Sequence, residues 1–293
     1  MATVAVVGVG GIGGYFASAA IAAGHDVAAC VRRPFTDLVV EKPDGDSLRY
    51  AIRVETDPEN VAPVDWVLLG TKVHQTAGAA PWLHALCTKG TSIAVLQNGV
   101  EHRATVAPFA NDARVVPTIV YCGAELIEPG RLKWNGRSQL VVEADDAGRS
   151  LEQLLSGPSA TVRVSEDFTT EAWTKLVVNA IANSITAITL RRLDVLGSPT
   201  SEPLVRALFA ECRAVATAEG AVIPPDDIDR MLATWHHIRS GGTSMYYDRR
   251  DGRHLEHEAI TGAVVRAADR HGIHVPSVRT IHGLLSAIDE SFD

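Results

Sequence analysis

The feature that most constrains the fold is a short apolar run followed at once by a glycine-rich loop and an alanine-rich segment. Val4–Val7 predicts a buried strand, and Gly13–Ala23 predicts a helix. Between them lies a G-x-G-x-x-G loop: Gly8, Val9, Gly10, Gly11, Ile12 and Gly13. In this context the first glycine permits a tight turn, the second lets the backbone approach a pyrophosphate, and the third lets the helix pack against the strand. The sequence therefore predicts a dinucleotide-binding β-α-β unit, with a ligand-free glycine turn as the alternative.

The end of the next predicted strand, Asp26–Val31, indicates which dinucleotide binds. NAD-binding proteins place Asp or Glu there for the ribose hydroxyls. This chain has Arg32 and Arg33 instead, and a guanidinium group matches the oxygens of a ribose 2′-phosphate. We therefore expect the cofactor NADPH, bound through Arg32. The alternative is a charged turn that contacts only solvent.

Strand and helix signals alternate along the first half of the chain. Further strands are expected at Trp66–Gly70, Ser92–Leu96, Arg114–Val120 and Leu140–Val142. Such alternation predicts an α/β fold with a doubly wound, mostly parallel sheet. We expect residues 1–165 to form a Rossmann-type NADP-binding domain.

The pattern changes to long helices beyond residue 165. The expected helices are Thr170–Ser184, Ser201–Glu219, Pro225–Arg239, Arg253–His271 and Ser277–Asp289. Residues 166–293 are therefore expected to form an all-helical substrate-binding and catalytic domain. Ligand sites favour the interface between two such domains.

Composition and spacing exclude several classes of protein. Lys and Arg number 27 against 35 Asp and Glu, a net charge of −8, so no nucleic-acid partner is expected. No basic leader or membrane-length apolar run is present, and the four cysteines form no C-x-x-C pair, which favours a cytoplasmic protein. His257-Glu258 does not open an H-E-x-x-H motif, because Thr261 stands where the second His would be. We expect no metal.

A polar column is predicted on the helix that begins near Thr170. Lys175, Asn179 and Asn183 lie four residues apart, so on a helix they share one face. Their neighbours are apolar, which places the column towards a pocket. Asparagine is a mediocre helix former. Its presence is explained either by a polar ligand or by structural hydrogen bonds, and the spacing favours neither.

Other polar residues stand at strand ends and in one later loop. Lys72 and Asn98 each follow a predicted strand, where open α/β sheets bind ligands. The dipeptide Asn98-Gly99 is also an ordinary turn. Ser244 either caps the next segment or binds a ligand. Glu256 near a helix start is favoured by the helix dipole even without a functional role.

These motifs together resemble the ketopantoate reductase (2-dehydropantoate 2-reductase) family over nearly the whole chain. The matching segments are Gly8–Gly13, Gly70–Lys72, Gln97–Gly99, Gly123-Ala124, Trp173–Asn183, Ser244-Met245 and Gly252–Glu256. The resemblance implies a Rossmann domain and a helical domain with the active site in the cleft between them. It also implies an oxidoreductase that uses NADPH to reduce 2-dehydropantoate to (R)-pantoate, in the route to pantothenate and coenzyme A.

The resemblance further implies a role for each matched residue. Lys175 corresponds to the general acid, and Glu256 to its acidic partner near the cofactor ribose. Asn98, Asn179, Asn183 and Ser244 correspond to substrate-contacting residues. Lys72 corresponds to a lysine that contacts the cofactor, Gly123 to a position whose backbone lies at the cofactor, and Asn98 is expected near the cofactor as well. A homodimer is the favoured assembly.

The chain departs from the family pattern at three places. Leu255 replaces the usual Thr before the key Glu, Thr261 replaces an Asn, and Thr189–Leu193 lacks an Asn that some members use. Arg191 and Arg192 in that segment either bind a different carboxylate or contact solvent. Two alternatives therefore stand beside ketopantoate reduction: reduction of another 2-keto acid with NADPH, and a non-catalytic NADP(H)-binding redox sensor.

Overall fold

Two compact units make up the chain. The computed structural model describes residues 1–237 and 241–292. Backbone contacts divide it into Met1–Phe168 and Thr169–Asp293. Among the described residues, every helix is too short or too polar to cross a membrane.

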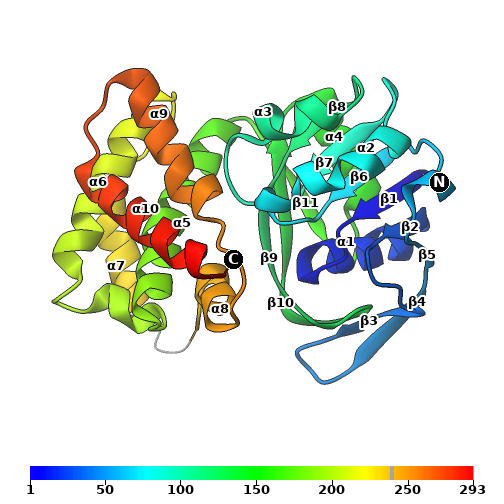
Figure 1. The fold of residues 1–293 in the computed structure, drawn as a ribbon, viewed down its shortest axis with the longest axis horizontal. Coiled ribbons are helices and arrows are strands. Elements are labelled where there is room, and N and C mark those ends of the chain that lie inside the picture. Colours follow the sequence, from blue (N-terminus) through cyan, green and yellow to red (C-terminus); the bar gives the residue numbers. More distant parts are fainter. Residues whose placement is uncertain (238–240, 293) are drawn as a thin grey trace. The chain divides into compact units, whose positions relative to one another are not determined.

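The first unit is built on a six-stranded parallel sheet (Figure 1). Its strands are β1 (Thr3–Val7), β2 (Asp26–Cys30), β5 (Arg53–Glu55), β6 (Trp66–Leu69), β7 (Ser92–Val95) and β8 (Arg114–Pro117). Their spatial order is β5-β2-β1-β6-β7-β8, and every pairing is parallel. Counted along the parallel strands, this is the Rossmann order 3-2-1-4-5-6.

Alternating side chains of these strands build an apolar core on each face of the sheet. Val4 and Val6 pack on one face with α1 (Gly11–Ala22) and α4 (Asp146–Leu155). Ala5 and Val7 pack on the other face with α2 (Ala80–Leu86) and α3 (His102–Val106). A sheet covered on both faces buries successive side chains on opposite sides, so its inner strands are nearly continuous apolar runs. The predicted doubly wound α/β fold is confirmed.

A second, five-stranded sheet covers the α1 side of the first unit. Its strands are β3 (Asp37–Glu41), β4 (Ser47–Ala51), β9 (Ile119–Glu128), β10 (Arg131–Glu143) and β11 (Thr161–Ser165). The order is β11-β10-β3-β4, with β9 antiparallel to β10. The Tyr15 ring of α1 stacks on the Trp134 ring of β10 at 5.1 Å between centroids. Of this sheet, the sequence predicted Leu140–Val142, which lies within β10, and the first two residues of β9, Ile119 and Val120, as the end of a longer strand.

One predicted strand of the first unit is divided between the two sheets. Arg114–Val120 was expected as one continuous strand, but β8 ends at Pro117 and β9 begins at Ile119 in the other sheet. The Thr118 hydroxyl donates to the Val95 carbonyl oxygen at 2.6 Å. This bond holds the chain at the point where it changes sheets.

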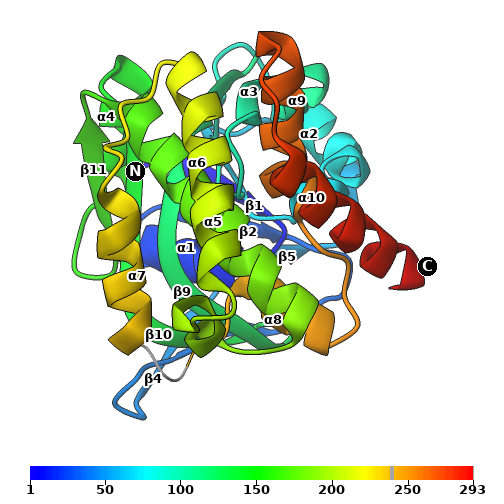
Figure 2. The same ribbon diagram turned by 90° about the vertical axis from the view of Figure 1, so that its left-hand side faces the viewer.

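The second unit is helical, as predicted (Figure 2). Its helices are α5 (Phe168–Thr189), α6 (Glu202–Ala218), α7 (Asp227–His237), α8 (Ser244–Arg250), α9 (Ala263–His271) and α10 (Pro276–Asp289), with a π-helical turn at Glu258–Gly262. Helices α6, α9 and α10 pack on one another. The Glu211 carboxylate of α6 accepts bonds from the backbone N–H groups of Ser277 and Val278, at 3.0 and 2.9 Å. It thereby caps α10, whose own N-cap residue offers no side-chain bond.

Two helix predictions need correction. The helix expected over Arg253–His271 begins only at His257, because residues 253–256 have no regular secondary structure. The seven-residue helix α8 was not among the predicted helices. Of the helix expected over Pro225–Arg239, residues 238 and 239 lie outside the described part of the chain.

Candidate active site

The predicted cofactor-binding residues of the first unit lie in loops at one edge of the parallel sheet. Val7 pairs with both Cys30 and Leu69, and Leu69 pairs with Val95, so β1, β2, β6 and β7 end at one level. The loops that carry Gly8, Arg32, Lys72 and Asn98 follow directly from these ends. Strands β1 and β6 are neighbours on either side of the topological switch point, where α/β sheets bind ligands.

Each of the three motif glycines has a distinct steric setting. Gly8 has a φ of +89°, and a Cβ there would lie 2.6 Å from the Thr71 backbone nitrogen. A Cβ on Gly13 would lie 2.1 Å from the Gly8 carbonyl oxygen. A Cβ on Gly10 would meet no protein atom within 4 Å. The fold therefore requires glycine at the first and third positions, whereas at the second only a ligand that approaches the backbone would require it.

The amino terminus of α1 is suited to an anion. Its N-cap residue, Gly10, makes no side-chain capping bond, and the first turn contains no acidic residue. The first N–H groups of a helix lack intrahelical partners, and the helix dipole favours negative charge beside them. These features fit the pyrophosphate of a dinucleotide.

Strand β9 passes close to this helix terminus. A Cβ on Gly11 would lie 2.2 Å from the carbonyl oxygen of Ala124. Gly123, the preceding residue, lies opposite a bulge in β10, with the Asn135 Cβ 3.2 Å from where its own Cβ would be. The structure thus brings Gly123 beside the glycine loop, although the two are more than 100 residues apart in the sequence.

Two arginines and a lysine surround the same sheet edge. Arg32 and Arg33 are exposed, and neither guanidinium has a hydrogen bond or ion pair among the described residues. Lys72 is half-buried at the start of the turn after β6. Two unpaired guanidinium groups after β2 fit a 2′-phosphate, since no protein carboxylate competes for them.

The buried Gln97 side chain positions two of these loops, a role that the sequence analysis did not assign. Its amide nitrogen donates to the Thr71 carbonyl and hydroxyl oxygens, both at 3.1 Å, and to the Thr76 hydroxyl at 3.0 Å. Gln97 lies between Leu96 and Asn98, so it links the loop after β7 to the loop that carries Lys72. A buried amide directly after an apolar strand is the sequence signal that could have revealed this role.

The polar column of the second unit lies on α5, as its spacing predicted. Lys175 and Asn179 are half-buried, and Asn183 is 3% exposed. The side-chain amides of Asn179 and Asn183 make no hydrogen bond within the described residues. The structure thus shows, among the described residues, no partner for the alternative of structurally bonded asparagines.

Ser244 is the first residue of α8, and the predicted capping role falls to its neighbour. The Thr243 hydroxyl accepts from the Tyr246 backbone N–H at 3.2 Å, and it lies 2.7 Å from the Thr186 hydroxyl of α5. Of the two alternatives for Ser244, the one in which it caps this segment is wrong. Thr186 lies one turn beyond Asn183, so this contact brings the start of α8 to the end of the polar column. The exposed Ser244 hydroxyl remains available to a ligand.

Glu256 lies in an irregular segment directly before the helical residue His257, and it is 5% exposed. A solvated first-turn acid would not be so deeply buried. Hydrogen bonds to the carboxylates of two other residues hold this segment. Arg253 donates to Asp248 at 3.0 Å, and the Leu255 backbone N–H donates to Asp289 at 2.6 Å. A hydrogen bond to a charged group stabilises by about 1.5–3 kcal/mol, so these bonds restrain the Glu256 backbone.

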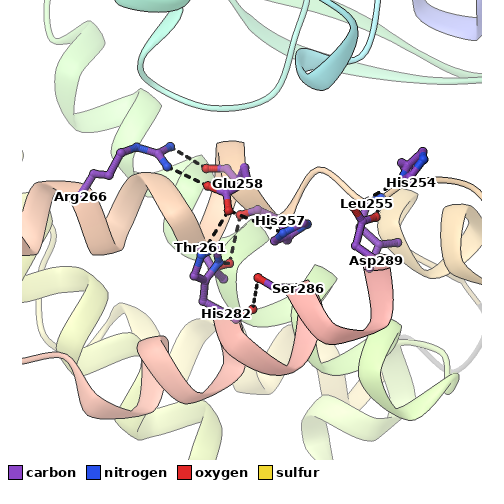
Figure 3. Close-up of polar contacts among 9 residues, drawn as sticks. All are labelled: His254, Leu255, His257, Glu258, Thr261, Arg266, His282, Ser286 and Asp289. Atoms are coloured by element: carbon purple, nitrogen blue, oxygen red, sulfur yellow. Dashed lines mark hydrogen bonds and ion pairs between the residues drawn. The ribbon is translucent and has the colours of Figure 1, made fainter. Parts of the chain in front are cut away.

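Asp289 is a positioning residue that the sequence analysis missed. It is the last residue of α10, and it bonds both the Leu255 N–H and the His254 ring, the latter at 3.3 Å (Figure 3). No local pattern marks it, because its partners lie about 35 residues earlier. Arg191, whose role was left open, forms an exposed ion pair with Asp194 at 2.6 Å.

Comparisons with known proteins agree with this arrangement. Residues 4–146 match the family model described as ketopantoate reductase PanE/ApbA, and residues 167–289 match its C-terminal model. The chain belongs to the ketopantoate reductase family. Among the family's curated members, the 2-dehydropantoate 2-reductase of Caulobacter vibrioides is 38% identical over 98% of this chain and 99% of that protein. The enzyme of the same name from Mycobacterium tuberculosis is 38% identical over 99% of both chains.

A solved structure of a family member shares the fold. The PanE/ApbA family ketopantoate reductase from Ralstonia eutropha is 30% identical to this chain. It superposes with a TM-score of 0.88, and the match covers 99% of each chain. The chain thus spans its relatives almost from end to end.

Proposed function

We propose that this chain reduces 2-dehydropantoate to (R)-pantoate with NADPH. The observation that carries the proposal is the combination of full-length 38% identity to two 2-dehydropantoate 2-reductases with the intact Lys175, Asn179 and Asn183 column on α5. A redox sensor that only binds the dinucleotide would not need this column. The reaction is expected in the cytoplasm, and a homodimer is the expected assembly.

The first unit, residues 1–165 as predicted, would hold the cofactor. The residues present fit a nicotinamide dinucleotide phosphate: the open face of Gly10, the uncapped α1 terminus and the unpaired Arg32 support it. The loop residues Gly8–Gly13 would cradle the pyrophosphate, with Lys72, Asn98 and Gly123 beside it. When bound, NADPH supplies a hydride to the ketone carbon of the substrate.

The second unit would supply the proton and most of the substrate contacts. Negative charge develops on the ketone oxygen as its carbon accepts the hydride. The Lys175 ammonium group stabilises that charge and donates the proton that completes the hydroxyl group. Lys175 then regains a proton from solvent. Glu256 would keep Lys175 protonated and would also contact the cofactor ribose.

Amide and hydroxyl groups suit the remaining polar parts of the substrate. Asn179 and Asn183 offer unpaired N–H donors, and Ser244 offers an exposed hydroxyl. With Asn98 they can bind the carboxylate and the terminal hydroxyl of 2-dehydropantoate. Binding of the hydroxyl distinguishes this substrate from simpler 2-keto acids, since a site built to bond a hydroxyl rejects analogues that lack it.

The test is NADPH oxidation by the purified full chain with 2-dehydropantoate and a panel of other 2-oxo acids. We expect the highest kcat/KM with 2-dehydropantoate. A higher value with another 2-oxo acid would reassign the substrate and keep the chemistry. NADPH binding without turnover of any acid in the panel would support the sensor instead.

The cofactor assignment has its own test in Arg32→Ala. Loss of this guanidinium removes a phosphate contact, so KM for NADPH should rise by roughly tenfold or more, about 1.4 kcal/mol of binding. KM for NADH should change little. The matched control is Arg53→Ala on the adjacent strand β5, whose guanidinium lies 3.9 Å from Glu55. Equal effects of Arg32→Ala on both cofactors would reject the assignment.

A further inference from the structure

Two histidines and a glutamate converge between the π-helical turn and α10 (Figure 3). The His282 Nε2 atom lies 3.4 Å from the Glu258 Oε1 atom, and the His257 Nε2 atom lies 3.7 Å from the same oxygen. The candidate ligand atoms of the three residues all lie within 4.8 Å of one another. His257 and Glu258 are adjacent, but His282 comes 24 residues after Glu258, which is why no sequence spacing revealed the group.

The hydrogen bonds of His282 leave its Nε2 lone pair directed towards a carboxylate. The Thr261 hydroxyl donates its one proton to the His257 carbonyl oxygen at 3.0 Å. At its 3.0 Å contact with His282 Nδ1 it must therefore accept, so that ring nitrogen carries the proton. In the neutral ring, Nε2 then presents a lone pair to Glu258 Oε1. Two electron-rich atoms at 3.4 Å repel each other unless a proton or a metal cation lies between them.

His257 supplies a second, independent observation. Its side chain is 9% exposed, and its Nδ1 atom has no partner among the described residues. The 3.7 Å separation of Nε2 from Glu258 is too long for a hydrogen bond. Nδ1 is therefore a buried polar atom without a partner, and Nε2, the nitrogen that faces Glu258, has no hydrogen bond to that carboxylate. Such groups are normally paired, so each exception needs an explanation.

We propose that His257, Glu258 and His282 bind a divalent transition metal ion of the zinc class. Two imidazole nitrogens and one carboxylate oxygen are a common set of three protein ligands for Zn²⁺, with water completing the tetrahedron. Ligand atoms about 2.0–2.1 Å from a tetrahedral centre lie roughly 3.3 Å apart. The separations of 3.4 and 3.7 Å from Glu258 are near this value, and the two histidines, whose ligand atoms lie within 4.8 Å of each other, would approach by side-chain movement.

The surroundings of the cluster are those of a metal site in two respects. The Thr261–His282 bond is the kind of outer contact that fixes the tautomer of a ligating histidine. Arg266 bonds the other carboxylate oxygen, Oε2, at 2.9 Å, which orients Glu258 and leaves Oε1 facing the rings. Thr261, one of the departures from the family pattern, thus has a local function. Because Glu256 directly precedes His257, a bound ion would also restrain the proposed active-site carboxylate.

The test is calorimetric titration of tag-free, chelator-treated full-length protein with Zn²⁺, in the absence of NADPH and substrate. We expect one ion per chain and a higher Tm with Zn²⁺, since a ligand of the folded state stabilises it. Co²⁺ should give a visible absorption band typical of four- or five-coordinate sites. These readouts do not depend on catalysis, so their failure would leave the proposed reductase activity untouched.

Variants that keep side-chain size assign the site. Thr261→Val removes the hydroxyl that bonds His282, and it should weaken Zn²⁺ binding roughly 10–100-fold. His257→Gln and His282→Gln each remove a proposed ligand and should weaken Zn²⁺ binding by more than this. His274→Ala, which removes an exposed histidine outside the cluster, should bind as the wild type does. Each variant's Tm without metal shows whether it is folded. Absence of binding by the wild type, or unchanged affinity in either Gln variant, would overturn the proposal.

Discussion

At the residue scale, the glycines of the first loop separate what the fold needs from what a ligand needs. Gly8 and Gly13 are held by protein contacts, with a positive φ at one and a 2.1 Å approach at the other. Gly10 is extended, with φ −85° and ψ −159°, and its open side faces no protein atom within 4 Å. The sequence motif alone treats all three alike, whereas the structure distinguishes them.

Alanine should therefore have different effects at Gly10 and at Gly13: at Gly10 it should impair NADPH binding, and at Gly13 it should destabilise the fold. Gly10→Ala should lower the free energy of unfolding by less than about 1 kcal/mol, the range of a changed N-cap residue. It should still weaken NADPH binding at least roughly tenfold, or 1.4 kcal/mol. Gly13→Ala should destabilise by about 1–3 kcal/mol or more through overpacking. Urea unfolding and fluorescence titration with NADPH measure the two effects. Unchanged NADPH affinity in Gly10→Ala would contradict the binding role of the loop.

Lys175 is the residue on which the proposed chemistry depends. Lys175→Ala removes the proton donor, so kcat should fall by roughly 10²–10⁴-fold, the usual contribution of a general acid. The affinity for NADPH should stay near the wild-type value. Lys89→Ala, at an exposed turn, serves as the matched control and should keep full activity. A Lys175→Ala enzyme with wild-type kcat would remove Lys175 from the mechanism.

At the scale of elements, the sequence predicted the parallel strands well because their apolar runs are buried on both faces. Strands β1, β2, β6 and β7 lie within a residue or two of their predicted bounds. The second sheet escaped prediction for physical reasons. Strand β4, Ser47–Ala51, is almost wholly exposed and shows no apolar alternation. Strand β10 contains a bulge at Asn135–Arg137, including Gly136 at φ +91°.

Tertiary contacts also overrode local signals around Glu256. The residues 253–256 have a helical pattern, but Gly252 adopts φ +64° and Asp289 takes the Leu255 N–H. That bond comes from the far end of α10, so no window of local sequence contains it. The column on α5 was predictable, because three polar residues at a spacing of four need only a helix to share a face. The distant partner that holds residues 253–256, Asp289, was not predictable from local sequence.

The contact between α6 and α9 predicts a pH-dependent contribution to stability. Burial opposes ionisation of Glu219, but hydrogen bonds from Arg270 and His271, at 2.9 and 2.8 Å, outweigh it and hold the pKa of Glu219 below its ordinary value. A carboxyl pKa that is lowered on folding stabilises the protein above the unfolded-state pKa of about 4.3. The contribution is lost as the pH falls through the lower folded-state pKa.

Glu219→Gln should therefore be less stable than the wild type at neutral pH, and the difference should vanish in acid. We expect about 0.5–1 kcal/mol near pH 7, because half-exposed partners are screened by solvent. Urea unfolding from pH 8 down to about pH 2, below the lowered pKa of Glu219, measures it. The control is Glu290→Gln, an exposed acid of the same unit, which should match the wild type throughout. A constant difference across this range would contradict the ion-pair explanation.

At the scale of the whole molecule, the two units carry complementary parts of one proposed reaction. The first unit offers a sheet edge with a glycine loop and unpaired arginines, which suits a phosphorylated dinucleotide. The second offers a lysine, two unpaired amides and a buried glutamate, which suit a small polar acid and its developing charge. Neither set alone would specify a keto acid reductase. Their presence in one chain, with end-to-end similarity to 2-dehydropantoate 2-reductases, supports that function.

The most direct test of this account follows a hydride from cofactor to product. Purified full-length protein is incubated with 2-dehydropantoate and NADPH carrying deuterium at both positions of nicotinamide C4, and the product is analysed by mass spectrometry. The account predicts pantoate that contains one deuterium, bonded to the carbon that was the ketone, and predicts almost none from Lys175→Ala in the same time. Absence of labelled pantoate from the wild-type protein, despite bound NADPH, would contradict it.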